Sequence, residues 1–291
     1  MATAKEIKQR IVSIKTTMQI TSAMKLVSAA KLRKAQNAIW QIRPYADKLQ
    51  EVLQNVSSGL SETDGNPYSI QREVKKVLLV VISSNKGLCG AFNNNVAKKT
   101  MELIDNEYKG YDIDIITVGK KAGEVLKHKG YGDLVKENYD SILSKKHIQY
   151  NDVAEIAQTI MNYFAEGKYD LVQIVYNKFK NAAVQILTVE QFLPVKIEQE
   201  ETNADYIFEP SMEYIVNHII PKALKIQFHK CVLDSLAAEH GARMTAMHKA
   251  TDNAKELVKE YTLQYNKARQ ASITNQILEI SSGAEALKNK N

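Results

Sequence analysis

Cysteines are nearly absent: the 291 residues include only Cys89 and Cys231. Neither has a neighbouring cysteine or a pair of histidines, so we expect neither a disulfide framework nor a zinc site. Long apolar runs are missing as well, since the longest, Val77 to Ile82, is far too short to span a bilayer. The first ten residues are charged and lack the apolar segment of a signal peptide. We therefore expect a mature chain that starts near Met1 and lies on the cytoplasmic side.

Recognisable catalytic and cofactor motifs are also absent. The six histidines stand singly, and no glycine-flanked serine nucleophile occurs. The loop at 84–90 has two of the three glycines of a dinucleotide fingerprint. Gly119-Lys120-Lys121 lacks both the first glycine and the hydroxyl residue of a P-loop. We predict no catalytic, cofactor or metal site, and we interpret both loops as strand-to-helix turns. An enzyme that uses the central sheet of the chain is the third and least favoured of three functional hypotheses, because these glycine motifs fail.

What the sequence does contain is helical periodicity at both ends. Thr3 and Glu6 form a possible capping box at the start of the first helix. Apolar residues then recur at steps of three and four, which is the spacing of a coiled-coil seam. The seam comprises Ile7, Ile11, Ile14 and Met18, followed by Leu32, Ala35, Ile39, Ile42, Ala46, Leu49, Leu53 and Val56.

Polar residues interrupt this seam once. Thr21, Lys25 and Ser28 occupy the expected apolar positions, while a neighbouring apolar stripe is shifted by one residue and comprises Ile20, Met24 and Val27. We therefore expect the seam to change phase over this stretch.

A second helical pattern starts near Ser211 and runs to about Leu287. Its seam comprises Ile219, Ile226, Leu233, Ala237, Met244, Met247, Ala254, Val258, Tyr261, Tyr265 and Ala268. Small residues such as Gly241, Ala242 and Ala246 lie beside it and permit close helix approach. Because neither terminal helix can bury its stripe alone, we predict that the two wrap on each other as an antiparallel coiled coil.

The middle of the chain has a different period. Short apolar runs at 77–83, 113–118, 170–179 and 182–193 alternate with helical stretches, and the last two runs are spaced as a hairpin. This alternation predicts a doubly wound, Rossmann-like α/β domain with mostly parallel strands and an antiparallel edge. The predicted organisation is an N-terminal coiled-coil helix at 1–60, an inserted α/β domain at 70–197, and a C-terminal helix at 210–291 that pairs with the first.

The net charge of +6 is unevenly distributed. Residues 8–43 include eight lysines or arginines and no acidic residue. Such a stretch favours an acidic partner, which could be nucleic acid, an anionic membrane surface or an acidic protein ring, unless it is a solvated helix face. Charge alone does not choose among these.

Several segments carry specific motifs. Residues 20–31 read ITSAMKLVSAAK and residues 43–45 read RPY, while residues 242–254 read ARMTAMHKATDNA. Residues 265–274 read YNKARQASIT, and residues 83–90 read SSNKGLCG. These segments resemble the gamma subunit of bacterial F-type ATP synthases: YNKARQASIT is close to a family signature, and SSNKGLCG is similar to a central family motif, with Ala91 replacing its last glycine. The resemblance covers the whole chain.

The resemblance implies a central-stalk rotor that carries torque between the membrane ion-driven c-ring and the catalytic hexamer of alpha and beta subunits. The chain would be non-catalytic, peripheral to the cytoplasmic face of the bacterial membrane, and in contact with the epsilon subunit. The implied hexamer contacts are Met24, Lys25, Arg243, Arg269 and Gln270. The implied foot contacts to ring or epsilon are Tyr206, Phe208 and Glu209, with Phe208 replacing a tyrosine of the family. Neither cofactor nor nucleic acid is implied.

The alternative hypothesis is a basic coiled-coil protein that binds nucleic acid, because a pI near 9.0 and an unopposed basic helix suit a phosphate backbone. It explains the charge of residues 8–43 but leaves the segment at 265–274 unexplained.

Overall fold

A computed structural model describes residues 3–57, 67–145, 148–195 and 212–288. Its contacts divide the chain into two compact units. The helix unit comprises Met1–Val27 and Thr245–Asn291, and the sheet unit comprises Ser28–Met244. Two long helices, α1 (Ala4–Ser57) and α6 (Met212–Lys288), contribute to both units. The boundaries expected from the sequence, at 1–60, 70–197 and 210–291, stay a prediction.

The sheet unit contains a five-stranded sheet with the strand order β3-β2-β1-β4-β5. Strands β1 to β4 run parallel, and β5 pairs antiparallel with β4 at the edge. This confirms the predicted doubly wound α/β domain with an antiparallel edge and a closing hairpin. The strands are β1 (Lys76–Ile82), β2 (Asp112–Val118), β3 (Val135–Asn138), β4 (Leu171–Phe179) and β5 (Gln185–Leu193).

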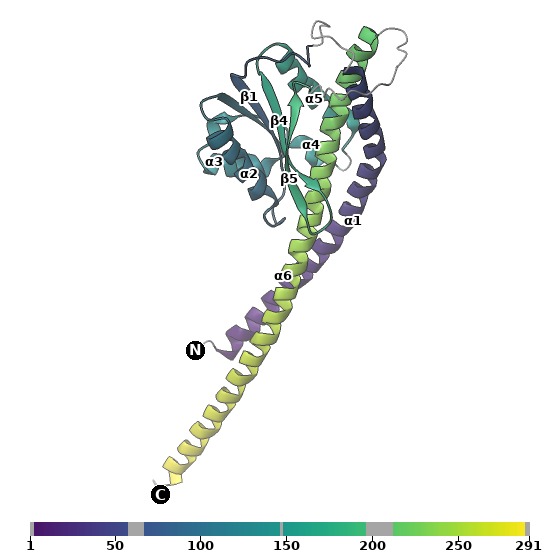
Figure 1. Ribbon diagram of the computed structural model, residues 1–291. Helices are drawn as coiled ribbons and strands as arrows, with labels where there is room; N and C mark the ends of the chain where they lie inside the picture. The colour runs from purple at the N-terminus through teal and green to yellow at the C-terminus, as the bar shows by residue number, and fades with distance from the viewer. Residues whose placement is uncertain (1–2, 58–66, 146–147, 196–211, 289–291) are drawn as a thin grey trace. The chain divides into compact units, whose positions relative to one another are not determined.

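Helices cover both faces of this sheet, with α2 and α3 on one face and α4, α5 and α6 on the other (Figure 1). Strand β1 is apolar throughout because its alternate side chains enter two different cores. The helices are α2 (Phe92–Glu102), continued by a π-helical turn at Leu103–Glu107, α3 (Lys120–His128), a 3₁₀ turn at Gly132–Leu134, α4 (Ser141–Ser144) and α5 (Tyr150–Ala165).

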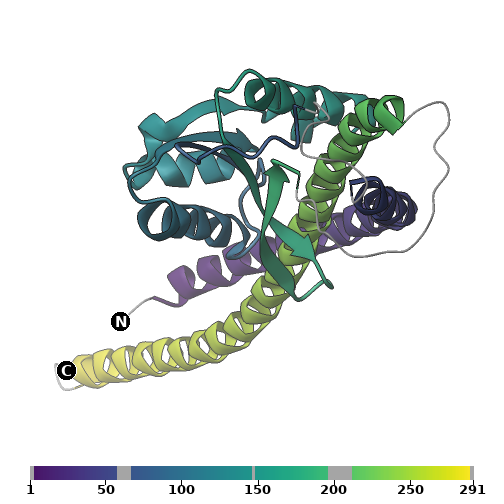
Figure 2. The same ribbon diagram turned by 45° about the horizontal axis from the view of Figure 1, so that its top comes forward.

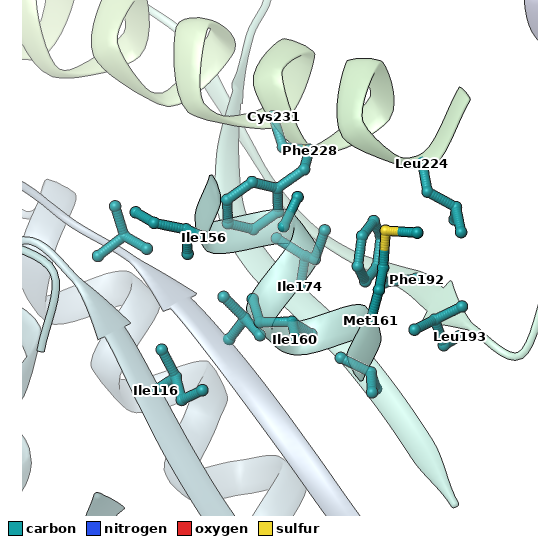
Figure 3. Close-up of a cluster of buried hydrophobic side chains, with 14 of the residues drawn as sticks. Ile116, Ile156, Ile160, Met161, Ile174, Phe192, Leu193, Leu224, Phe228 and Cys231 are labelled. Atoms are coloured by element: carbon teal, nitrogen blue, oxygen red, sulfur yellow. The ribbon is translucent and has the colours of Figure 1, made fainter. Parts of the chain in front are cut away.

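One side of α6 belongs to the core of the sheet unit. Leu224, Phe228 and Cys231 point from α6 toward the side chains of α5 and β5 (Figure 3). The rings of Phe228 and Phe192 lie 5.8 Å apart between centroids. The terminal helix therefore completes the α/β core, in addition to serving as a coiled-coil strand.

The other side of α6 packs against α1 within the sheet unit. Leu233 and Ala237 of α6 form a buried cluster with a stripe of α1 that comprises Leu32, Ala35 and Ile39. Arg43 Nη2 of α1 donates to Asp234 Oδ1 of α6 at 3.1 Å. The two helices run side by side in opposite directions here (Figures 1 and 2), as the seam predicts.

The small residues of α6 have a different partner from the expected one. A Cβ atom at Gly241 would lie 3.2 Å from the carbonyl oxygen of Ala182, in the turn of the β4–β5 hairpin that crosses α6 (Figure 2). Ala242 packs beside Cys89 and Phe92. Gly241 and Ala242 therefore let the β4–β5 turn and the start of α2, rather than α1, approach α6 closely.

The helix unit preserves the predicted cap and seam. The backbone N–H of Thr3 donates to Glu6 Oε2 at 3.0 Å, and the N–H of Glu6 donates to Thr3 Oγ1 at 3.3 Å, which confirms the capping box. The seam side chains of both helices are buried or half-buried, from Ile7 to Met18 on α1 and from Met247 to Ala268 on α6. The described residues beyond Ala268 with a described side chain are exposed.

The expected change of phase at residues 20–28 is wrong. Thr21 and Ser28 stay on the buried side, with exposed fractions of 9% and 3%, whereas Ile20 and Val27 are 55% and 57% exposed. The seam keeps its phase because a buried threonine hydroxyl can form hydrogen bonds with nearby groups. Thr21 Oγ1 lies 2.8 Å from Thr251 Oγ1 of the facing helix, and the Thr251 hydroxyl reaches the carbonyl oxygen of Met247 at 2.8 Å.

We expect Thr21→Val and Thr251→Val to be strongly non-additive. After either single substitution, the remaining hydroxyl faces a methyl group instead of a hydrogen-bond partner across the seam. The free energy of unfolding should therefore fall by about 1 kcal/mol. The double variant replaces both hydroxyls by methyl groups of similar shape and should return to within roughly 0.5 kcal/mol of the parent. Urea unfolding of the four proteins of this cycle measures the coupling. Additive losses would show that the hydroxyl pair does not interact.

Candidate functional site

The loop after β1 is held by its own side chains. The N–H of Ser84 donates to Asn93 Oδ1 at 3.0 Å, and the Ser84 hydroxyl reaches the carbonyl oxygen of Lys86 at 2.7 Å. Positive φ angles at Leu88 and Gly90 turn the chain into α2. Burial raises the pKa of the Cys89 thiol, which disfavours the reactive thiolate form. The loop is thus a packed turn with a buried, unreactive cysteine.

The N-terminus of α3 is occupied in the same way. Lys121 N–H donates to the carbonyl oxygen of Ser84 at 3.0 Å, and Lys120 N–H donates to Asn85 Oδ1 at 3.2 Å. Ala122 N–H donates to the hydroxyl of Ser83 at 3.1 Å. In a P-loop, such amide groups face a phosphate. Here they bind the loop after β1, which agrees with the failed phosphate motifs of both loops.

Arg243 of α6 also binds the loop after β1. The guanidinium pairs with Glu239 Oε1 at 2.6 Å, and Nη2 donates to the carbonyl oxygens of Lys86 and Gly87 at 2.8 and 3.2 Å. Arg243 is only 7% exposed. Burial raises the pKa of the Glu239 carboxyl, and the adjacent Arg243 opposes that rise. The side chain joins α6 to the end of β1.

A cavity of about 560 Å³ opens beside Arg243 within the sheet unit. It lies between α1, α6, the loop after β1 and the segment around α4. Its charged lining residues are mostly basic: Lys31, Lys34, Lys86, Lys145 and Arg243. The sequence shows Lys31 and Lys34 only as members of the basic stretch, and it gives no sign that Lys86 and Lys145 join them.

The structure places the residues of the expected hexamer contacts in different settings. Arg269 and Gln270 are exposed, while Met24 and Lys25 are half-buried, all four in the helix unit. Arg243 lies in the sheet unit with intramolecular partners that the family resemblance did not imply. The expected foot contacts, Tyr206, Phe208 and Glu209, lie outside the described residues. Within the described ranges, no cluster of side chains is suited to a metal ion.

These features define a class of protein. Its members have a Rossmann-like domain inserted between two long helices that pair with each other. The family model described as ATP synthase matches residues 3–287. The chain therefore belongs to the ATP synthase gamma-chain family. None of its described helices is both long enough and apolar enough to cross a membrane.

Curated relatives match over the full length. The chain is 55% identical to the ATP synthase gamma chain of Flavobacterium johnsoniae over 99% of each chain. It is 54% identical to the gamma chain of Flavobacterium psychrophilum, over 99% of this chain and 100% of the relative. These relatives give no support to the nucleic-acid alternative.

Solved structures of ATP synthases share the fold. The central stalk and c-ring of the Tetrahymena thermophila mitochondrial enzyme contain a chain that is 28% identical, with a TM-score of 0.61 over 79% of this chain and 99% of that one. A chain of the Euglena gracilis mitochondrial ATP synthase is 22% identical, with a TM-score of 0.71 over 98% and 94% of the two chains. The second likeness shows the fold alone.

Proposed function

We propose that the chain is the central-stalk rotor subunit of a bacterial F-type ATP synthase. It transmits torque between the membrane ion-driven ring and the catalytic alpha/beta hexamer during ATP synthesis or hydrolysis. The relatives, which are gamma chains over their whole length, support this role. So does the Tetrahymena likeness, whose structure is described as a central stalk with its c-ring.

The observation that carries the proposal is the apolar surface of the helix unit. Large apolar side chains stand exposed away from the seam on both helices: Val12, Ile20, Leu26, Val27, Leu263, Ile273, Ile277, Leu278 and Ile280. A helix pair that has already filled its seam needs a further apolar partner to cover so many side chains. A surrounding hexamer supplies that cover, and Lys8, Arg10 and Lys15, which are exposed on the helix unit, suit acidic loops on it.

Individual contacts are part of the same proposal. Arg269 and Gln270 are exposed on the helix unit and would contact the hexamer there. Met24 and Lys25, which are half-buried, would contact it through their accessible atoms. Arg243 would reach a hexamer loop only through the small part of its surface that its intramolecular bonds leave accessible. The foot contacts Tyr206, Phe208 and Glu209 face the ring or epsilon in this proposal.

The chain acts within the complex without catalysing bond changes. It lies on the cytoplasmic face of the bacterial membrane and attaches through the ring. Its three proposed parts, 1–60, 70–197 and 210–291, correspond to one shaft helix, the inserted α/β domain and the second shaft helix. The occupied amide groups at the N-terminus of α3 support the absence of nucleotide hydrolysis by the chain itself.

Single-molecule rotation tests the proposal. Cys89 and Cys231 are buried, so a single exposed cysteine, Lys109→Cys, directs a bead to the sheet unit. The chain is co-assembled with alpha, beta and epsilon subunits, and the hexamer is immobilised through beta. We expect the bead to turn in one direction when ATP is added and to stop when ATP is removed.

Two outcomes would contradict the rotor role. An assembled hexamer that hydrolyses ATP while the bead stays still would show that the chain does not rotate. Recovery of DNA instead of alpha and beta subunits from affinity purification, with a steep salt dependence, would favour the nucleic-acid alternative.

A further inference from the structure

The cavity beside Arg243 lies at a characteristic ligand position of doubly wound folds. In open α/β sheets, ligands occupy the crevice outside the carboxyl ends of the strands, where the strand order reverses. Here the chain passes from β1 outward to β2 and β3, and returns to the other side of β1 as β4. Asn85 and Lys86, just after β1, line the cavity together with residues of α1 and α6.

The charge of the cavity is unbalanced. Among the described residues that line it, five side chains are basic and one, Glu239, is acidic. Glu239 is paired with Arg243, and Lys145 Nζ is paired with Asp152 at 2.7 Å. Lys31 and Lys86 form no ion pair with any described residue. At least two ammonium groups therefore remain available at one opening.

A buried imidazole completes the wall. His240 is 8% exposed, and its Nδ1 atom has no hydrogen-bond partner among the described residues. Burial, with added repulsion from Arg243 and Lys31, lowers the pKa of His240 to about 4. The ring is therefore neutral at pH 7, so His240 adds no charge to the wall. The cations of the cavity are thus opposed by Glu239 alone among its described lining residues.

We propose that this cavity binds a small multivalent phosphate anion, namely a diphosphate group, between Lys31 and Lys86. The volume of about 560 Å³ is that of a small-molecule site. The backbone amides at the N-terminus of α3 are already hydrogen-bonded, whereas the cavity offers side-chain cations. The proposal is independent of the rotor role.

Titration calorimetry with pyrophosphate tests the proposal on the full-length chain, in a metal-free buffer at low ionic strength. We expect one site per chain, with an affinity that falls as salt is raised. In Lys31→Ala with Lys86→Ala, the affinity should fall at least about tenfold, because two charge-assisted contacts are lost. Both lysines are exposed on the cavity side, so the fold should survive, and circular dichroism checks this.

The matched control is Lys98→Ala with Lys129→Ala, which removes the same charge from exposed positions outside the cavity. We expect it to bind as the parent does. If the affinity for pyrophosphate falls equally in both double variants, net charge alone explains the effect and the proposed site is wrong. Absence of measurable binding of pyrophosphate to the parent at millimolar concentration would also overturn it.

Two further titrations identify the source of the diphosphate group. If ADP binds more tightly than pyrophosphate, and loses affinity in the same variant, the group belongs to a nucleotide. If ADP binds equally or more weakly, the free anion is the ligand. Inorganic phosphate should bind more weakly than either, because it carries less negative charge than a diphosphate group.

Discussion

Arg243→Ala is expected to lower the free energy of unfolding by about 3–5 kcal/mol, because it leaves a buried carboxylate without its cation. Glu239 lies one helical turn away, almost fully buried, with Arg243 as its ion-pair partner at 2.6 Å. The substitution also removes the donors to the carbonyl oxygens of Lys86 and Gly87. Urea unfolding at pH 7 measures the loss.

The pH dependence of this loss has a definite sign. Burial already raises the pKa of Glu239, and removing Arg243 takes away the main opposing influence. The relevant pH window lies between the pKa of Glu239 in the unfolded chain and its higher pKa in the folded chain. Within this window, folded Arg243→Ala binds more protons than the unfolded variant. Stability of the variant should therefore fall as pH rises through that window. Relative to the parent, the defect should be smaller at pH 5 than at pH 8.

Two companion variants separate the ion pair from the loop contact. Glu239→Gln with Arg243→Ala removes the buried charge and should recover part of the loss. Glu239→Gln alone keeps the donors to Lys86 and Gly87 and should cost less than Arg243→Ala. If Arg243→Ala instead unfolds at the same urea concentration as the parent at every pH, the guanidinium is not a structural link. Altered rotation by that variant would then report a hexamer contact directly.

The elements that could be predicted from the sequence are those with a strong local pattern. β1 was predictable because it is buried on both faces and reads as a continuous apolar run, and α5 because one face is apolar. β3 was missed because it is a short edge strand, VKEN, with alternate exposed side chains and a shifted register against β2. The four residues of α4 form too short a helix to show a period.

The candidate site was less predictable, because its contacts join residues far apart in the chain. The motif around Arg243 suggested an outward-facing contact, and nothing local indicated that the side chain would reach the loop after β1, more than 150 positions earlier. Thr21 misled for a related reason: its polarity suggested exposure, yet its hydroxyl is satisfied by Thr251 on the facing helix. Hydrophobic periodicity predicts which face is buried, but it does not show which polar groups find partners.

Gly119→Ala is expected to lower the free energy of unfolding by about 4 kcal/mol or more, since it combines backbone strain with a main-chain clash. Gly119 has a φ of +101°, and a Cβ atom there would lie 2.3 Å from the carbonyl oxygen of Ser83. The backbone cannot move away at low cost, because the residues that follow Gly119 are bonded to the loop after β1. Lys121 N–H donates to Ser84, and Ala122 N–H donates to Ser83.

The matched control is Gly110→Ala, which has a similar φ of +93° but no atom within 4 Å of the added carbon. It should show the strain alone, roughly 1–2 kcal/mol. Urea unfolding followed by circular dichroism compares the two variants with the parent. Equal losses in both would mean that the turn at Gly119 relaxes freely, and that the contact between Ser83 and α3 does not fix the loop that Arg243 holds. A larger loss in Gly119→Ala, by at least about 2 kcal/mol, would show that this close approach of main chains anchors the end of β1.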